Sequence, residues 1–292
     1  MTRVAELAAE YTRVRPRLVG VAYSIVGTLA EAQDVVSDCW LKLVEADGRD
    51  RVLDLEAWAV VAVARRAVDV LRSARVQREE YVGPWLPEPL VDPGVPDPAE
   101  RVTLDDTVSY ALMVVLETLT PAERTTWVLN EVFGMPFPEI AEVVGRSPAA
   151  VRQLAVRARA HITARAPRVE VAAPEHRRVV DAFLSAVEGG DLAALVGLLD
   201  PDVVLTSDGG GLLGVARRPV HGPDRVARFV LGVRRKVAAD EHLRPLAING
   251  GPGFAVVRAD GTTRFVCAIT VDLDRVRRVD IVVAPAKLPD AL

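Results

Sequence analysis

The sequence predicts a multidomain protein in which two all-α helical domains are followed by an α+β domain. Three observations predict this order: helical periodicity of the apolar residues up to residue 168, a proline-rich interruption, and short β-branched runs after residue 175. The 292 residues, half of them apolar, are enough for more than one core. We expect helical domains at 1–80 and 105–168, a linker at 81–104 and the α+β domain at 175–288.

The first helical domain has apolar residues at helical spacing in residues 18–26, 32–44 and 55–71. The second run also carries an acidic stripe on the side away from its apolar face. The stripe consists of Asp34, Asp38 and Glu45 and is interrupted by Leu41. An acidic stripe with one exposed leucine suits a basic helical partner, in which the leucine anchors and the carboxylates set the register. A solvated acidic face is the alternative interpretation.

The third run and the residues after it, up to residue 78, contain a cluster of arginines with few acids among them. It is a candidate DNA-binding surface. Its members are Arg65, Arg66, Arg72, Arg75 and Arg78. The linker after it holds six prolines within residues 81–100, which excludes a continuous helix and favours an extended tether.

Residues 120–165 contain the most informative motif, a helix-turn-helix. Thr120 and Glu123 have the spacing of a capping box around Pro121, and a short second helix is predicted from Pro138. Gly145 permits the turn.

The third helix of this motif is predicted to begin at a Ser147 cap, with Pro148 in its first position. Its apolar residues repeat on one face, Gln153 and Val156 point the other way, and arginines flank them. Amide and small side chains would then face DNA bases while arginines contact phosphates. The arginines are Arg152, Arg157 and Arg159. An amphipathic helix with a solvated basic face is the alternative.

The last part of the chain predicts two helices and then strands near residues 203–206, 254–258, 263–272 and 276–283. Three ionisable residues near strand ends are candidates to line a pocket, where a buried acid would act as a general base. They are Asp208, His221 and Asp280. Turn and loop roles are the alternative, and we assign no catalytic residue.

Composition excludes several classes of protein. The four histidines and two cysteines, Cys39 and Cys267, show no metal-ligand spacing, so no metal or other cofactor is expected. No apolar run has transmembrane length and no signal peptide is apparent, which predicts a cytoplasmic protein without a membrane partner. The net charge of −4 contrasts with the acid-free basic stretch at 143–167, so a larger partner is expected to supply much of any DNA affinity.

The order of these parts resembles an extracytoplasmic-function sigma factor of bacterial RNA polymerase. The segments AEAQDVVSDCWLKL and EAWAVVAVARRAVDVLRSAR and the helix-turn-helix carry the resemblance. It implies that RNA polymerase core and promoter DNA are the partners. The implied core-binding residues are Asp34, Asp38, Trp40 and Leu41; the implied minus-ten residues are Arg65, Arg66, Asp69, Arg72 and Arg75; the implied minus-thirty-five residues are Ser147, Arg152, Gln153, Arg157 and Arg159.

The linker YVGPWLPEPL and the motifs SDGGG and NGGPG resemble the subgroup that carries a SnoaL-like cone-shaped domain. This subgroup usually has a lysine after DGGG, where this chain has Leu212. The resemblance implies control in cis by that domain, no separate anti-sigma partner and no enzymatic activity. The implied regulatory residues are Trp85, Asp208, Gly209, Gly210, Gly211, Asn249, Gly250 and Gly251.

Two other classes of function compete with this interpretation. The C-terminal domain would be a ligand sensor or a cyclase- or isomerase-like enzyme in the first. In the second, the chain would be a repressor-type helix-turn-helix protein that binds an operator without polymerase.

Overall fold

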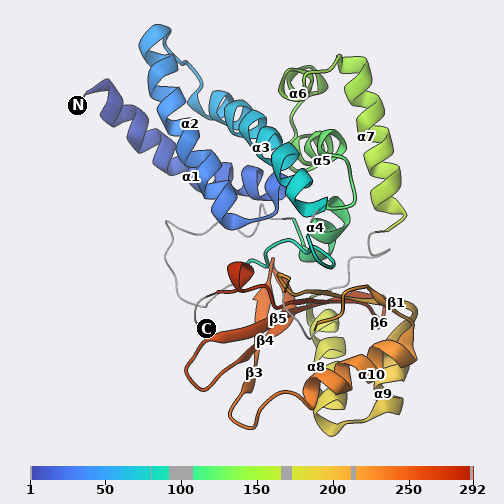
Figure 1. Cartoon of the computed structure of the whole chain (residues 1–292). Helices are drawn as coiled ribbons and strands as arrows, with labels where there is room; N and C mark the ends of the chain where they lie inside the picture. The colour runs from blue at the N-terminus through green and yellow to red at the C-terminus, as the bar shows by residue number, and fades with distance from the viewer. Residues whose placement is uncertain (1, 80, 92–107, 166–172, 212–214, 290–291) are drawn as a thin grey trace. The chain divides into compact units, whose positions relative to one another are not determined.

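The computed structural model describes residues 2–79, 81–91, 108–165, 173–211, 215–289 and 292 (Figure 1). The side chains of 75–79 and Ala173 lie outside this description. The chain divides into two units. The first comprises 1–79, 95–108 and 112–165, and the second comprises 80–94, 109–111 and 166–292. The described linker residues 81–91 therefore group with the C-terminal domain.

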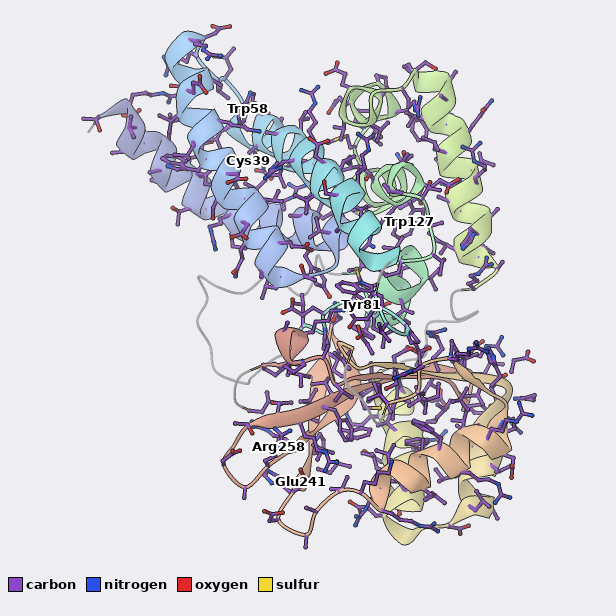
Figure 2. All side chains as sticks on the ribbon, in the orientation of Figure 1. Cys39, Trp58, Tyr81, Trp127, Glu241 and Arg258 are labelled. Atoms are coloured by element: carbon purple, nitrogen blue, oxygen red, sulfur yellow. The ribbon has the colours of Figure 1, made fainter. Side chains whose placement is uncertain are left out.

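The first unit is helical. Its three long helices pack on one another through apolar residues such as Val21, Ile25, Val36 and Val63, all fully buried. Cys39 lies in this core on α2 (Figure 2). The helices are α1 (Arg3–Val26), α2 (Leu29–Arg49), α3 (Leu55–Glu79), α4 (Tyr110–Leu116), α5 (Pro121–Trp127), the π-helix η2 (Val128–Val132), α6 (Phe137–Val144) and α7 (Pro148–Thr163).

The helix-turn-helix motif forms as its sequence predicts. Thr120 and Glu123 make both bonds of a capping box at the start of α5. Gly145 has a φ of 67°, which a side chain would disfavour, and Ser147 caps α7 by accepting a hydrogen bond from the N–H of Ala150 at 3.3 Å. The second helix differs slightly from prediction, because it begins at Phe137 and places Pro138 in its second position.

The second unit contains a six-stranded sheet with the order β2-β1-β6-β5-β4-β3. Its neighbours are antiparallel except for the β1–β6 pair, which is parallel. The strands are β1 (Leu199–Asp208), β2 (Val220–His221), β3 (His242–Ile248), β4 (Gly251–Val257), β5 (Thr263–Asp272) and β6 (Arg275–Val282). The other elements are the helices α8 (Ala173–Gly189), α9 (Leu192–Leu198) and α10 (Pro223–Arg234) and the short 3-10 helix η3 (Pro285–Lys287).

Helices α8, α9 and α10 cover one face of this sheet, as Figure 1 shows. Phe183 and Val230 from the helices pack with Phe265 and Ile281 from the sheet. This is the cone-shaped α+β fold, and the predicted fold class is confirmed. The sequence prediction omitted α10, β2 and β3. The edge strand β3 has exposed Arg244 and Pro245, so it lacks the apolar alternation that marks a strand.

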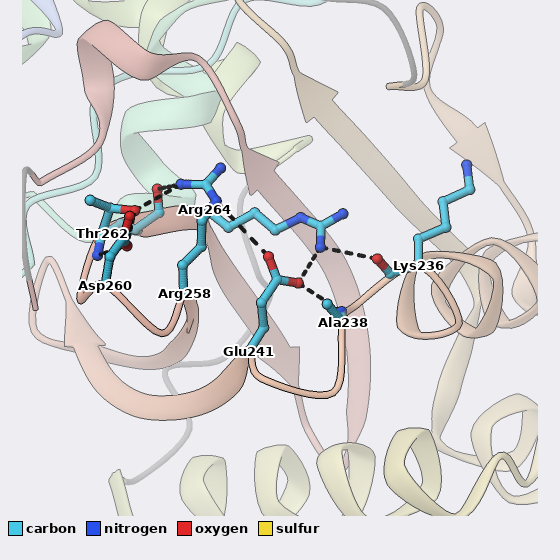
Figure 3. Close-up of polar contacts among 8 residues, drawn as sticks. Lys236, Ala238, Glu241, Arg258, Asp260, Thr262 and Arg264 are labelled. Atoms are coloured by element: carbon cyan, nitrogen blue, oxygen red, sulfur yellow. Dashed lines mark hydrogen bonds and ion pairs between the residues drawn. The ribbon is translucent and has the colours of Figure 1, made fainter.

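A polar cluster fixes the turn between α10 and β3 (Figure 3). The Glu241 carboxylate accepts hydrogen bonds from the N–H of Ala238 at 2.9 Å and from Arg264, which also donates to the carbonyl of Lys236 at 3.0 Å. Burial raises the pKa of Glu241, but these donors and Arg258 outweigh burial and lower it. The charged carboxylate therefore ties the turn to β5. Among the helices that the structure describes, none is long and apolar enough to cross a membrane.

Candidate nucleic-acid interface and linker-binding site

The exposed face of α7 carries the residues predicted to read DNA. Gln153 is exposed, and the Val156 side chain is 64% exposed although it is apolar. The opposite face is held by Val151, Leu154 and Ala158, which are buried. An exposed amide beside an exposed apolar side chain matches the chemistry of base edges and thymine methyl groups.

The arginines that flank this face are held by neighbouring helices. Arg157 pairs with Glu123 at 3.0 Å, and Arg159 pairs with Glu131 at 2.5 Å. Arg152 lies 5.9 Å from the centroid of the Phe137 ring. The two ion pairs are largely exposed on the arginine side, so each contributes little to stability and is readily exchanged for a phosphate.

The α3 arginines are positioned similarly. Arg66 donates to Asp38 of α2 at 3.1 Å, Arg65 pairs with Glu142 of α6 at 3.4 Å, and Arg72 lies 3.7 Å from Asp69. The side chain of Arg75 lies outside the described residues. The structure thus brings a predicted core-binding acid, Asp38, together with a predicted DNA-binding arginine.

The predicted core-binding residues of α2 differ in exposure. Leu41 is 70% exposed and Asp34 is exposed, as the acidic stripe requires. Trp40 is only half-buried and stacks at a tilt on Tyr11, with ring centroids 5.3 Å apart. The exposed leucine between carboxylates is the part of this surface with the chemistry of a protein contact.

A buried arginine joins the first helical bundle to the helix-turn-helix. Arg124 on α5 is 2% exposed and donates through Nε to the carbonyl of Ser24 on α1 at 3.0 Å. Another of its nitrogens donates to Glu117 at 2.5 Å. Its third nitrogen, Nη2, and the buried hydroxyls of Ser24, Thr125 and Thr126 have no hydrogen-bond partner in the part of the chain that the structure describes. This interface is polar and incompletely satisfied, which limits its stability.

In the second unit, the linker segment 81–91 lies against a buried carboxylate. Asp208, at the end of β1, is completely buried. It accepts hydrogen bonds from the hydroxyl of Tyr81, from the N–H of Leu86 at 2.9 Å and from the N–H of Gly210 at 3.1 Å. Burial and the bond to Asp208 raise the pKa of Tyr81 above its usual range, so this phenol stays protonated. Tyr81 is labelled in Figure 2.

Lys287 completes this site, which we call the linker clasp (Tyr81, Trp85, Leu86, Asp208 and Lys287). Its Nζ donates to Asp208 at 2.7 Å and to the carbonyl of Leu86 at 2.6 Å, and its side chain is 5% exposed. Nζ also lies 3.0 Å from the centroid of the Trp85 ring, which packs edge-on against Tyr81. A buried ion pair thus holds a backbone segment and two aromatic rings of the linker.

A second contact holds the end of the same segment. The backbone N–H of Asn249 donates to the carbonyl of Leu90 at 2.8 Å, and the Asn249 side-chain oxygen accepts from the N–H of Leu90 at 3.0 Å. Val91 forms a β-bridge to Ile248. The predicted extended tether is therefore bound as an added piece of strand over these residues.

The predicted glycine loops pack closely against other parts of the C-terminal domain. A Cβ at Gly209 would lie 2.3 Å from Val215, and one at Gly210, whose φ is 62°, would lie 3.1 Å from Ala284. Gly250 and Gly251 continue the turn at Asn249, and Gly211 also has a positive φ. Leu212 lies outside the described residues. The lysine that meets Asp208 is instead Lys287, which the sequence interpretation missed. It is one of only three lysines in a chain rich in arginine, and that is the signal that marks it.

The pocket prediction for the acids is wrong. The cone encloses an apolar cavity of about 40 Å³, and its lining residues do not include Asp208, His221 or Asp280. Strand alternation explains this, because Val279 and Ile281 face the cavity and Asp280 therefore faces the other side of the sheet. Burial raises the pKa of Asp280, and the ion pair with Arg278 at 2.8 Å opposes it. His221 is exposed. Among the described residues, no group of three or more His, Cys, Asp or Glu is placed to hold a metal.

Comparisons with known proteins agree with this arrangement. The family model Sigma-70 region 2 matches residues 11–76, and Sigma-70 region 4 matches residues 109–162. The ECF RNA polymerase sigma factor SigJ of Mycobacterium tuberculosis is 43% identical over 228 residues, which cover 77% of this chain and 72% of that protein. The probable ECF sigma factor SigI of the same species is 32% identical over 99% of this chain and 97% of its own length.

The solved structures include a match of nearly full length. The crystal structure of M. tuberculosis SigJ superimposes with a TM-score of 0.78 at 35% sequence identity, covering 96% of this chain and 97% of that chain. The described helices α1–α3 correspond to region 2 and α4–α7 to region 4. The chain belongs to the extracytoplasmic-function RNA polymerase sigma factors, non-enzymatic proteins that direct polymerase core to promoter DNA.

Proposed function

We propose that the C-terminal domain controls this sigma factor in cis by holding the linker between regions 2 and 4. The observation that carries the proposal is the linker clasp, in which Asp208 and Lys287 bind the backbone of Leu86 and Lys287 also packs on Trp85. A buried ion pair with satisfied hydrogen bonds holds the linker in one position on the domain, because removal of either charged partner leaves the other charge buried and uncompensated.

Holding the linker shortens the connection between the two promoter-binding regions. Residues 81–91 are bound to the C-terminal domain, and eleven extended residues span about 36–40 Å. Release of the clasp returns that length to the connection. The clasp therefore acts on how far regions 2 and 4 can separate.

The docked arrangement of the two regions makes separation necessary. Arg65 of α3 contacts Glu142 of α6 at 3.4 Å, and α3 also packs on α5. Promoter elements at minus ten and minus thirty-five lie roughly 85 Å apart along B-DNA at 3.4 Å per base pair. Regions in direct contact cannot reach both elements at once. Opening of the Arg124 interface is part of the proposed activation.

Within this proposal the residues keep the roles inferred from the sequence. Asp34, Asp38, Trp40 and Leu41 bind core polymerase in the cytoplasm, α3 reads the minus-ten element and α7 reads the minus-thirty-five element. Because the chain carries its own restraint, no separate anti-sigma factor is required.

Truncation tests the proposal. We expect a chain ending near Pro174 to give at least threefold more transcript than the full chain in run-off transcription with core polymerase, because Tyr81–Val91 loses the surface that holds it. Equal activity of both chains, at equal occupancy of core, would exclude control in cis while leaving the sigma function intact.

Two substitutions in α7 separate base reading from phosphate contact. Gln153→Ala is expected to cost about 1–3 kcal/mol at one promoter position and to relax specificity there, whereas Arg157→Ala weakens binding of all sequences alike. Holoenzyme binding to a panel of single-base minus-thirty-five variants measures both. A uniform loss with Gln153→Ala would show that this amide does not read a base.

A further inference from the structure

Regions 2 and 4 together form an arginine-lined groove of about 520 Å³. Region 2 contributes Arg72 from α3. Region 4 contributes the start of α5, the turn residue Arg146 and one side of α7. Its charged lining residues are Arg72, Arg146 and Arg157, and Gln153 lies beside them. Arg72 is the one lining residue from region 2, so docking adds this guanidinium to a groove that region 4 otherwise forms.

The charge of this groove favours an anion. Arg146 has no carboxylate within 4 Å among the described residues, and Arg72 has only a loose exposed contact with Asp69 at 3.7 Å. Arg157 forms an ion pair with Glu123, with 3.0 Å between its Nε and the carboxylate oxygen. Burial raises the pKa of Glu123, but the bonds from Thr120 and Arg157 outweigh burial and lower it, so this carboxylate stays charged. The three arginines therefore have two carboxylate partners, Glu123 and Asp69, and the contact with Asp69 is loose.

The groove also holds a side-chain amide, which can donate a hydrogen bond to an anion. The Gln153 amide makes no hydrogen bond to a described residue. Guanidinium groups bind phosphate in a forked geometry with two parallel hydrogen bonds. Several such forks around one space match a ligand that carries consecutive phosphates.

The size of the groove limits the ligand. A volume of about 520 Å³ falls in the range of roughly 300–1,000 Å³ typical of small-molecule sites. We propose that the docked form binds a small polyphosphate, the phosphate chain of a nucleotide or an inorganic polyphosphate, between Arg72, Arg146 and Arg157.

This ligand would stabilise the docked form. A ligand held by Arg72 as well as by region 4 binds the docked arrangement more tightly than the separated one, and mass action then favours docking. It also covers Gln153 and Arg157. The consequence for transcription rests on the proposed DNA-reading role of these two residues, whereas the binding site itself does not.

Titration calorimetry of the full chain with sodium tripolyphosphate, at constant ionic strength, tests the site. We expect saturable binding of one ligand per chain, weakened at least tenfold by Arg72→Ala combined with Arg146→Ala. The matched control combines Arg13→Ala with Arg178→Ala, which removes two exposed arginines elsewhere and is expected to change the affinity less than twofold. Absence of saturable binding, or equal weakening by both pairs, would overturn the proposal.

A second arm separates free polyphosphate from DNA phosphate as the source. Saturating tripolyphosphate is expected to reduce promoter-fragment binding by the unmodified chain with core polymerase at least fivefold more than sulfate does at equal ionic strength. In the Arg72→Ala, Arg146→Ala chain the two salts should act alike. If this double substitution weakens promoter binding while tripolyphosphate fails to bind the unmodified chain, the groove is a contact for DNA phosphates and the proposal is wrong.

Discussion

Replacement of Lys287 by methionine is expected to release the linker and to raise the amide exchange rate of Leu86 by roughly two to four powers of ten. The substitution keeps the length of the side chain and removes its charge, so Asp208 becomes an unpaired buried carboxylate. Breaking a buried ion pair in this way costs about 3–5 kcal/mol. Hydrogen exchange of residues 81–91, read by mass spectrometry, measures the effect where it arises.

Matched variants separate loss of the clasp from general damage. Lys236→Met makes the same chemical change at an exposed lysine and should leave exchange of 81–91 unchanged. Adding Asp208→Asn to Lys287→Met removes the unpaired charge and should recover part of the lost protection, which makes the two effects non-additive. Additive effects would mean that the pair is not the energetic link between linker and domain.

Replacement of Arg124 by methionine is expected to undock region 4 from region 2. The docked form loses a charged hydrogen bond to the carbonyl of Ser24, worth about 1.5–3 kcal/mol, and so the separated population should rise by one to two powers of ten. Pulsed dipolar spectroscopy between spin labels on Leu41→Cys and Val156→Cys reports the distance between regions, because both positions are exposed. The native cysteines are buried, and burial raises the pKa of Cys39 to about 11, so they remain unlabelled.

A double variant distinguishes the docking contact from stability within region 4. Arg124 also pairs with Glu117, which is in region 4 itself. Adding Glu117→Gln removes the negative charge that Arg124 faced without restoring the bond to Ser24. If the double variant docks again, loss of the ion pair inside region 4 caused the separation. If the regions stay separated, the hydrogen bond from Arg124 to Ser24 is the contact that holds them together.

Local chemistry made much of the fold predictable. The capping box of Thr120 and Glu123, the turn at Gly145 and the buried face of α7 follow from short-range spacing, and all are confirmed. The strands β1, β4, β5 and β6 also fall where the β-branched runs predict them. The residues that make local hydrogen bonds or local periodic patterns are therefore the ones that sequence reasoning places well.

Long-range contacts were not predictable. Lys287 lies 79 residues from Asp208 and 201 residues from Leu86, and no local pattern joins them. Proline density correctly excluded a helix over the described linker residues 81–91 but gave no sign that Tyr81 and Trp85 are bound. The burial of Asp280 was equally unpredictable, because it depends on the pairing of β6 with β1 and β5. The DNA- and core-binding residues stay predictions.

Run-off transcription with core polymerase, comparing the Lys287→Met and Lys236→Met chains at equal occupancy of core, tests the central claim most directly. The two chains have the same composition and net charge, and differ only in whether the linker clasp is intact. Control in cis through the clasp predicts that Lys287→Met gives at least threefold more transcript, because the freed linker lets regions 2 and 4 reach both promoter elements. Equal or lower transcript from Lys287→Met would contradict it.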